Sequence, residues 1–227
     1  MPTFMCRALV RTVTVLLAVV LLAAQPAHAR KVKCRSVPVF VESSRLADTA
    51  RACEGARDAV RFLASQGLDA PPVISIKVVD NMPEAVPRAA LGAYSRSEQM
   101  IYVLDYAAFR RRHNTFKVPA APSIYRAVIS HEVAHAIAFH NFKSEPTLLG
   151  QEYIAFVTFF ATLRPDLREE ILWRYDYDAD WQLYAVILYL TDALEFGAHA
   201  YWHFLRPENG RRYLQRILAG EVLTLDN

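Results

Sequence analysis

The chain has little net charge, few cysteines and no apolar run long enough to cross a bilayer, and each absence excludes a class of protein. The formal charge is +3 over 227 residues. No sustained basic stripe or nucleic-acid-reading motif is present, so nucleic acid is not an expected partner. The apolar run VTVLLAVVLLAA at 13–24 is shorter than the roughly 20 residues that a transmembrane helix needs. We therefore expect no stable membrane span.

The same apolar run has the features of a secretory signal. Arg7 and Arg11 precede it, and Ala27-His28-Ala29 follows it with small residues where a signal peptidase requires them. We expect residues 1–29 to be a signal peptide and the protein to be exported to the periplasm or the extracellular space. An uncleaved membrane anchor is the alternative.

Residues 30–227 have a length that suits one domain with a sizeable core. They keep two cysteines, Cys34 and Cys53. In an exported protein such a pair predicts a disulfide, which would close a loop of about 20 residues and stabilise the fold by about 3 kcal/mol. The bond would join the N-terminal arm to a helix expected over 46–66. Two buried free thiols are the alternative.

The periodic segments predict an α+β fold, with a small N-terminal sheet packed on a mostly helical C-terminal half. In the N-terminal half, residues 73–80 alternate and are β-branched, which indicates a strand, and 92–105 indicate a hairpin or two short strands. In the C-terminal half, Ser123 is the expected N-cap of a helix that ends near His140.

Further helices are expected over 147–163 and 165–175, and from Asp178 or Asp180 through about residue 205. The last of these contains the apolar run YAVILYL at 184–190. Since acidic residues bracket this run, it predicts a buried core helix and not a membrane span.

The pentapeptide HEVAH at 131–135 carries the strongest functional signal. Residues four positions apart lie on one face of a helix, so His131 and His135 can present two imidazole nitrogens to one ion. A catalytic zinc uses three protein ligands and keeps one position open. Glu132 would border that ion and could take a proton from water. A helix with two partly buried histidines that hydrogen-bond to neighbours is the alternative.

A third ligand must come from outside the pentapeptide. A histidine six residues after His135 is excluded, because that position is Asn141. In the helix expected over 147–163, Glu152 is the only acid. A carboxylate among apolar side chains is costly to bury unless it is paired or bound to a metal, which favours Glu152 as the ligand. Glu145 is a rival, and an exposed Glu152 on a surface stripe is the alternative.

These two segments together resemble the gluzincin zinc metallopeptidases, the thermolysin-like group with two histidines and a downstream glutamate. The matching residues are HEVAH and QEYIA (151–155), and the resemblance extends over about residues 92–165. It implies one Zn²⁺ per chain, held by His131, His135 and Glu152, with Glu132 as the general base. The stretch 92–105 also looks like the edge strand of that group, which implies a peptide substrate along the strand near 99–104.

One position departs from the gluzincin pattern. Many relatives carry an aspartate four residues after the glutamate ligand, and it orients a ligating histidine. This chain has Phe156 there. The orientation of the histidines must therefore come from elsewhere or be weaker.

A peptidase also needs a donor to stabilise the negative charge that develops on the substrate oxygen. The stretch EFGAHAYWHF (195–204) offers His199, Tyr201 and His203 for this role, and Tyr153 is a further candidate. These histidines could instead lie on the outer side of a long helix. With Glu195 they could also form a second metal-binding face.

The sequence as a whole favours an exported zinc-dependent metallopeptidase that cleaves peptide bonds with metal-activated water. The alternative is a non-catalytic envelope protein, for binding or scaffolding, that retains a gluzincin-like metal site. A partner protein that completes the cleft is compatible with both.

Overall fold

The computed structural model describes residues 29–112 and 116–223. The predicted signal peptide lies outside the described residues, apart from Ala29. No helix in the described part of the chain is long and apolar enough to cross a membrane.

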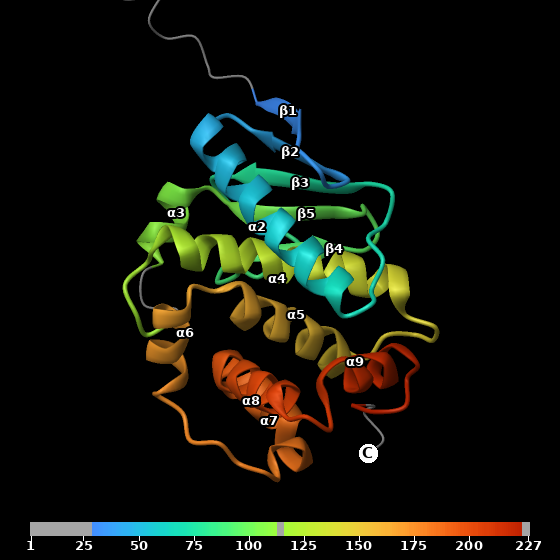
Figure 1. Ribbon diagram of the computed structural model, residues 1–227. Coiled ribbons are helices and arrows are strands. Elements are labelled where there is room, and N and C mark those ends of the chain that lie inside the picture. The colour runs from blue at the N-terminus through green and yellow to red at the C-terminus, as the bar shows by residue number, and fades with distance from the viewer. Residues whose placement is uncertain (1–28, 113–115, 224–227) are drawn as a thin grey trace, which may run out of the picture.

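A mixed sheet of five strands forms the N-terminal half of the described chain (Figure 1). The strands lie in the order β1 (Arg30–Lys33), β2 (Val39–Ser43), β3 (Ile74–Val79), β5 (Met100–Leu104) and β4 (Gly92–Ser95). The three central strands run parallel to one another, whereas β1 and β4 pair antiparallel at the two edges.

The alternation of residues along the strands gives the sheet one buried and one open face. Val41, Ile76 and Ile101 lie side by side in register and are almost fully buried. Their neighbours Lys77 and Tyr102 point to the opposite face, which stays partly exposed. This period of two is what the sequence at 73–80 predicts.

Eight α-helices surround or follow this sheet in the described residues, and the α+β prediction is confirmed. They are α2 (Leu46–Ser65), α3 (Tyr106–Arg111), α4 (Pro122–Asn141), α5 (Leu148–Thr162), α6 (Pro165–Leu172), α7 (Ala185–Thr191), α8 (Ala193–Leu205) and α9 (Gly210–Leu218), with a 3₁₀ turn at Trp181–Tyr184 before α7. The first long helix, α2, lies over β2 and β3, and α4 lies over β5 and β4 (Figure 1).

The helix that carries HEVAH is held between neighbours on several sides. It contacts α2, α5 and β4. Gly55 of α2 lets the two long helices approach closely, because a Cβ at this position would lie 2.5 Å from the Arg126 carbonyl oxygen. The Ser130 hydroxyl donates to the Gly55 carbonyl at 2.9 Å across the same crossing. The position of α4 is therefore set by backbone contacts as well as by apolar packing.

The start of α4 differs from the prediction. The helix begins at Pro122, with Ala121 in the N-cap position, so Ser123 is not the N-cap. Proline favours the first helical position because its φ is already helical and its missing N–H would have had no partner there.

The long C-terminal helix predicted through residue 205 is broken in two. Asp192 ends α7 and caps α8, since its carboxylate accepts from the backbone N–H groups of Leu194 and Glu195, both at 3.1 Å. The same carboxylate pairs with Lys117 at 2.7 Å. An aspartate in this position competes with helix continuation and starts a new helix instead.

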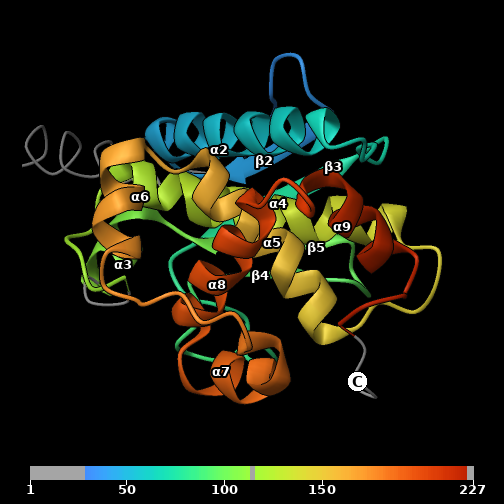
Figure 2. The same cartoon turned by 60° about the horizontal axis from the view of Figure 1, so that its bottom comes forward.

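The prediction that YAVILYL forms a buried core helix is wrong for one side of α7. Ala185 and Leu188 are buried, but Ile187 is 65% exposed and Leu190 is 72% exposed. The fold places this helix at its periphery, with only one face against the core (Figure 2).

The edge strand is also not where the sequence placed it. The segment near 99–104 is β5, which pairs on both sides, with β3 and with β4. The open edge next to α4 belongs to β4.

The predicted disulfide between Cys34 and Cys53 is confirmed. It links the segment after β1 to α2, across 19 positions of sequence, and both cysteines are buried. Replacing both cysteines by alanine should lower the free energy of unfolding by about 3 kcal/mol, because the unfolded chain loses a constraint on a loop of this size. Urea unfolding measures this difference.

Reductant is the control for that measurement. It should shift the unfolding midpoint of the unmodified protein toward that of the double variant and leave the variant unchanged. Equal midpoints for the two proteins in oxidising buffer would contradict the stabilising role of the bond.

Candidate metal centre

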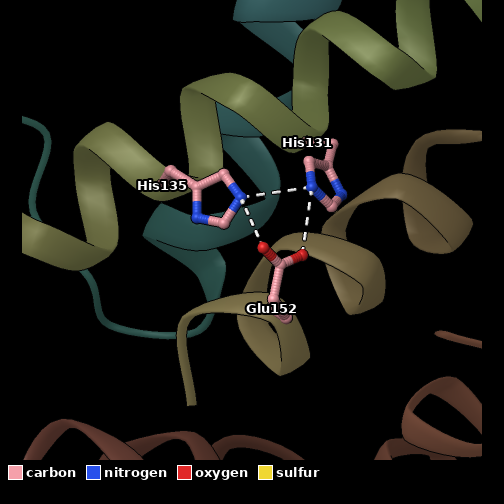
Figure 3. Close-up of side chains that lie close together, drawn as sticks. All are labelled: His131, His135 and Glu152. Carbon is pink, nitrogen blue, oxygen red and sulfur yellow. Dashed lines mark hydrogen bonds and ion pairs between the residues drawn. The ribbon is translucent and has the colours of Figure 1, made fainter. Parts of the chain in front are cut away.

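His131 and His135 lie one turn apart on α4 and point in the same direction (Figure 3). Their Nε2 atoms are 3.1 Å apart. Both side chains are mostly buried, with 14% and 10% of their surface exposed. The four-residue spacing therefore brings the two Nε2 atoms close together on one side of the helix, as the sequence predicts.

Glu152 reaches the same point from α5. This helix starts at Thr147, whose hydroxyl caps it by accepting from the Gly150 N–H at 3.1 Å, and it returns against α4. The Glu152 carboxylate lies with Oε2 at 3.5 Å from His131 Nε2 and Oε1 at 3.7 Å from His135 Nε2 (Figure 3). The structure thus brings together the three residues that the sequence assigned to a metal.

The spacing of these donors suits a small metal ion. Tetrahedral ligands at about 2.0–2.2 Å from an ion lie about 3.3–3.6 Å from one another. The two Nε2 atoms are 3.1 Å apart, each lies 3.5 or 3.7 Å from a different Glu152 oxygen, and one ligand atom from each residue can be chosen so that all lie within 4.8 Å of one another. The group could therefore hold a metal ion, and it is the one such cluster of three or more ligand residues in the described part of the chain.

The protonation preferences of two of the three residues, His135 and Glu152, suit a cation. Burial lowers the pKa of His135 to about 4, which keeps its imidazole neutral. Burial alone would raise the pKa of Glu152, but the hydrogen bond with His131 and the nearby imidazoles outweigh it and lower the value to about 2. The pKa of His131 is raised, since its contacts with Glu152 and Glu132 outweigh the opposing effect of burial. An ionised carboxylate and neutral imidazoles are the forms that bind metals, so Glu152 and His135 are in the binding form and a metal ion would displace the proton that Glu152 and Glu132 favour on His131.

Tyr189 is a site residue that the sequence did not reveal. Its hydroxyl donates to Glu152 Oε1 at 3.0 Å from the separate helix α7. Burial raises the pKa of the Tyr189 phenol, so it stays a proton donor. No motif connects Tyr189 with the HEVAH segment, because the two meet only through the packing of α7 on α5.

Phe156 occupies the place where many gluzincins have an aspartate, and its ring packs edge-on against His131. The two ring centroids are 4.6 Å apart. Gly197 of α8 makes room for this ring, since a Cβ there would lie 2.4 Å from Phe156 Cδ1. Neither histidine Nδ1 has a hydrogen-bond partner among the described residues. Apolar packing therefore orients His131 where a carboxylate would otherwise do so.

Glu132 lies beside the cluster without being one of its three donors. It is 7% exposed and rests against β4, where a Cβ on Gly92 would lie 2.6 Å from its Cγ. The main chain of Tyr94 hydrogen-bonds its carboxylate. Burial is the main reason that the pKa of Glu132 rises to about 7, and the Glu152 charge adds to it.

The cluster opens into a cavity of about 630 Å³. Its walls come from the segment 86–91, β4, α4, α5 and the junction of α7 and α8. Aromatic side chains form much of the lining: Tyr94, Phe116, Phe139, Phe156, Phe159 and Tyr189. The three donors and Glu132 therefore line one cavity.

The predicted oxyanion donors lie elsewhere. His199 is buried against Trp181, and its Nδ1 faces the Asp178 N–H at 3.5 Å. His203 Nδ1 hydrogen-bonds the hydroxyl of Tyr153 at 2.9 Å.

Tyr201 packs on Phe160 and Arg168. None of these predicted donors lines the cavity that holds the cluster. The cause is the break at Asp192, which sets the direction of α8.

The rival ligand Glu145 and the nearby His140 also lie apart from the cluster. Glu145 is exposed and pairs with Arg96 at 2.6 Å. His140 lies in the exposed last turn of α4. A second metal face at 195–203 is not formed, because the described residues contain no other cluster of this kind.

Comparison with known proteins gives a family but no activity. A family model described as a family of unknown function, DUF6639, matches residues 39–226. Because the match covers most of the chain, the protein belongs to that family. No curated protein and no solved structure matches it.

The cluster predicts that the protein binds about one metal ion per chain. His131→Ala and Glu152→Ala should each lose most of the bound metal, since two donors hold an ion far less tightly than three. Mass spectrometry of the purified proteins measures the metal content. His140→Ala removes a histidine from the exposed end of the same helix and is the matched control. Full metal content in Glu152→Ala would remove this residue from the ligand set.

Proposed function

We propose that this member of the DUF6639 family is an exported zinc-dependent metallopeptidase that hydrolyses peptide bonds. The observation that carries the proposal is the arrangement of one cavity. Three metal-ligand side chains, a buried glutamate that is not among them and an open strand edge all face it. The resemblance of HEVAH and QEYIA to the gluzincins supports the same assignment.

Zinc is the metal that this donor set favours. Two imidazole nitrogens and one carboxylate oxygen, with a further position open to solvent, are the donors of catalytic zinc sites. When bound, zinc would lower the pKa of a water molecule and polarise the substrate carbonyl. His131, His135 and Glu152 would hold it, and Tyr189 would keep the Glu152 carboxylate in place through its hydrogen bond.

Glu132 is placed to move the proton. Water adds its oxygen to the peptide carbonyl carbon, and the Glu132 carboxylate accepts the proton that this oxygen releases. The same proton then passes to the peptide nitrogen as the C–N bond breaks, which leaves a free amine and a free acid. A purely structural metal site does not require a buried carboxylate beside the ligands, where Glu132 lies.

The free edge of β4 supports binding of an extended peptide. Leu104 N–H donates to the Leu91 carbonyl at 3.0 Å, which identifies the hydrogen-bonded pairs of the β4–β5 ladder. In this register the main-chain groups of Gly92 and Tyr94 point away from β5, and both residues line the cavity. The Tyr94 N–H already bonds Glu132, so a substrate strand would use the remaining groups. A substrate strand would add here, at 92–95, and not near 99–104.

Tyr189 is our candidate for the donor that the sequence assigned to His199, Tyr201 or His203. Its hydroxyl lies in the cavity, 3.0 Å from a proposed ligand oxygen. Since a tyrosine has a single O–H, it would donate to a substrate oxygen that gains negative charge only by giving up its hydrogen bond to Glu152.

The proposal predicts that Glu132→Gln lowers peptide hydrolysis by about 10²–10⁴-fold, since the amide cannot accept the proton. Metal content should stay unchanged, because Glu132 is not among the ligands. Cleavage of a mixture of fluorogenic peptides by the zinc-loaded protein measures activity, with His131→Ala as the variant that loses both metal and activity. If Glu132→Gln cleaved the peptides as fast as the unmodified protein, the proposed role of Glu132 as the general base would be contradicted. A metal-loaded protein that cleaves nothing would favour the binding or scaffolding role.

A second prediction concerns the contact between β4 and Glu132. Gly92→Ala places a methyl group within 3 Å of three Glu132 atoms, so the carboxylate must move. Activity should fall while metal content and unfolding midpoint change little. Ala93→Ser, at the neighbouring position of the same strand, is the control. Unchanged activity in Gly92→Ala would show that the position of Glu132 is not critical.

A further inference from the structure

The helix that brings Tyr189 to the metal cluster carries an uncovered apolar face on its other side. Leu183, just before α7, is 86% exposed, and Val186, Ile187 and Leu190 are 39%, 65% and 72% exposed. Val186, Ile187 and Leu190 lie at helical spacing on the outward side of α7, and Leu183 lies in the 3₁₀ turn that precedes it. We refer to these four residues as the α7 stripe.

A helix that is apolar all round is typical of a buried helix. Here Ala185 and Leu188 pack inward and Tyr189 reaches Glu152, while the α7 stripe faces outward. Large exposed apolar patches mark interaction surfaces in proteins that fold in water. The helix lies at the far side of the molecule from α2, so no other part of the described fold covers it (Figure 2).

The surroundings of the stripe are acidic. Residues 175–205 contain three aspartates before the stripe and two further acids after it, and they contain no lysine or arginine. A hydrogen bond to Asp178 raises the pKa of Tyr184 to about 12, and the charges of Glu195 and Asp180 act in the same direction. In the described part of the chain, three side-chain cations from outside this segment contact it: Lys117 pairs with Asp192, Arg206 lies over the Tyr177 ring and Arg168 lies over the Tyr201 ring. None of these three forms an ion pair with Asp178, Asp180 or Glu195.

We propose that the α7 stripe is a docking surface for an apolar polypeptide segment flanked by lysine or arginine. The apolar side chains of this segment would cover the stripe, and its cations would meet the acids around Tyr184. A second copy of the chain is a poorer fit, because a two-fold contact over the stripe would bring the same acids together. An anionic lipid surface would be repelled for the same reason.

The position of the stripe connects docking with the cavity. Tyr189 and Thr191, on the same helix, line the cavity that holds the metal cluster. The stripe residues themselves do not line the cavity, so a segment bound to them would lie on the outer side of the helix that forms this wall of it. The docking goes beyond the proposed hydrolysis, since it requires neither the metal nor Glu132.

Binding of a fluorescent peptide tests the proposal directly. The probe has about 20 residues, with a central run of leucine and alanine and two lysines at each end. The double variant Ile187→Ser/Leu190→Ser should weaken its binding by at least about tenfold, because exposed anchors of this size dominate an interface. Leu46→Ser removes an apolar side chain that is 74% exposed on α2, and it should leave binding unchanged.

A second peptide tests the charge requirement. The same apolar run flanked by glutamates should bind more weakly than the lysine-flanked probe, and added salt should reduce the difference. Glu132→Gln should bind the lysine-flanked probe as tightly as the unmodified protein, whether or not that protein hydrolyses peptides. Failure of the proposed peptidase activity would therefore not affect this test.

Three outcomes would overturn the docking proposal. One is equal binding of the lysine-flanked probe by the double variant and the unmodified protein. Another is that the unmodified protein sediments with phosphatidylcholine vesicles and the double variant does not, which would assign the stripe to a membrane surface. The third is a concentration-dependent dimer that the same variant abolishes, which would assign it to a second copy.

Discussion

The site depends on one constraint: two imidazoles and a carboxylate are buried together and must satisfy one another. Each of these groups would be costly to bury alone. In this fold Glu152 lies within 3.7 Å of both His131 and His135, and the same arrangement suits a metal ion. The packing of α4 on α5 is therefore tied to the chemistry of the three side chains. The close contact of α4 with α2 at Gly55 holds the other side of the helix.

Around this cluster, two glycines allow the contacts that shape the site. Gly197 admits the Phe156 ring, which packs on His131, and Gly92 admits the carboxylate of Glu132 against β4. At both positions a side chain would occupy space that another residue already fills. The geometry of the site thus depends on the two glycines of α8 and β4 as well as on the three proposed ligands of α4 and α5.

The helix α7 links the cluster to the surface of the protein. One side places Tyr189 on Glu152, and the other side presents Ile187 and Leu190 to solvent. Both sides are apolar apart from the tyrosine hydroxyl, which is why the sequence of α7 predicts complete burial. In the fold only one side of α7 is buried, and a docked polypeptide would cover the other side.

The sequence by itself determined the features that depend on local spacing or on residue chemistry. The pair His131 and His135 follows from the helical repeat, Glu152 from the cost of burying a lone acid, and the disulfide from the number of cysteines. Only the tertiary structure decided which strand has the open edge, where Asp192 breaks the last helix and that Tyr189 meets Glu152. Tyr189 and Glu152 are 37 positions apart, and their contact depends on how α7 packs on α5. Periodicity describes the inward face of an element, but it does not say which other element that face will meet.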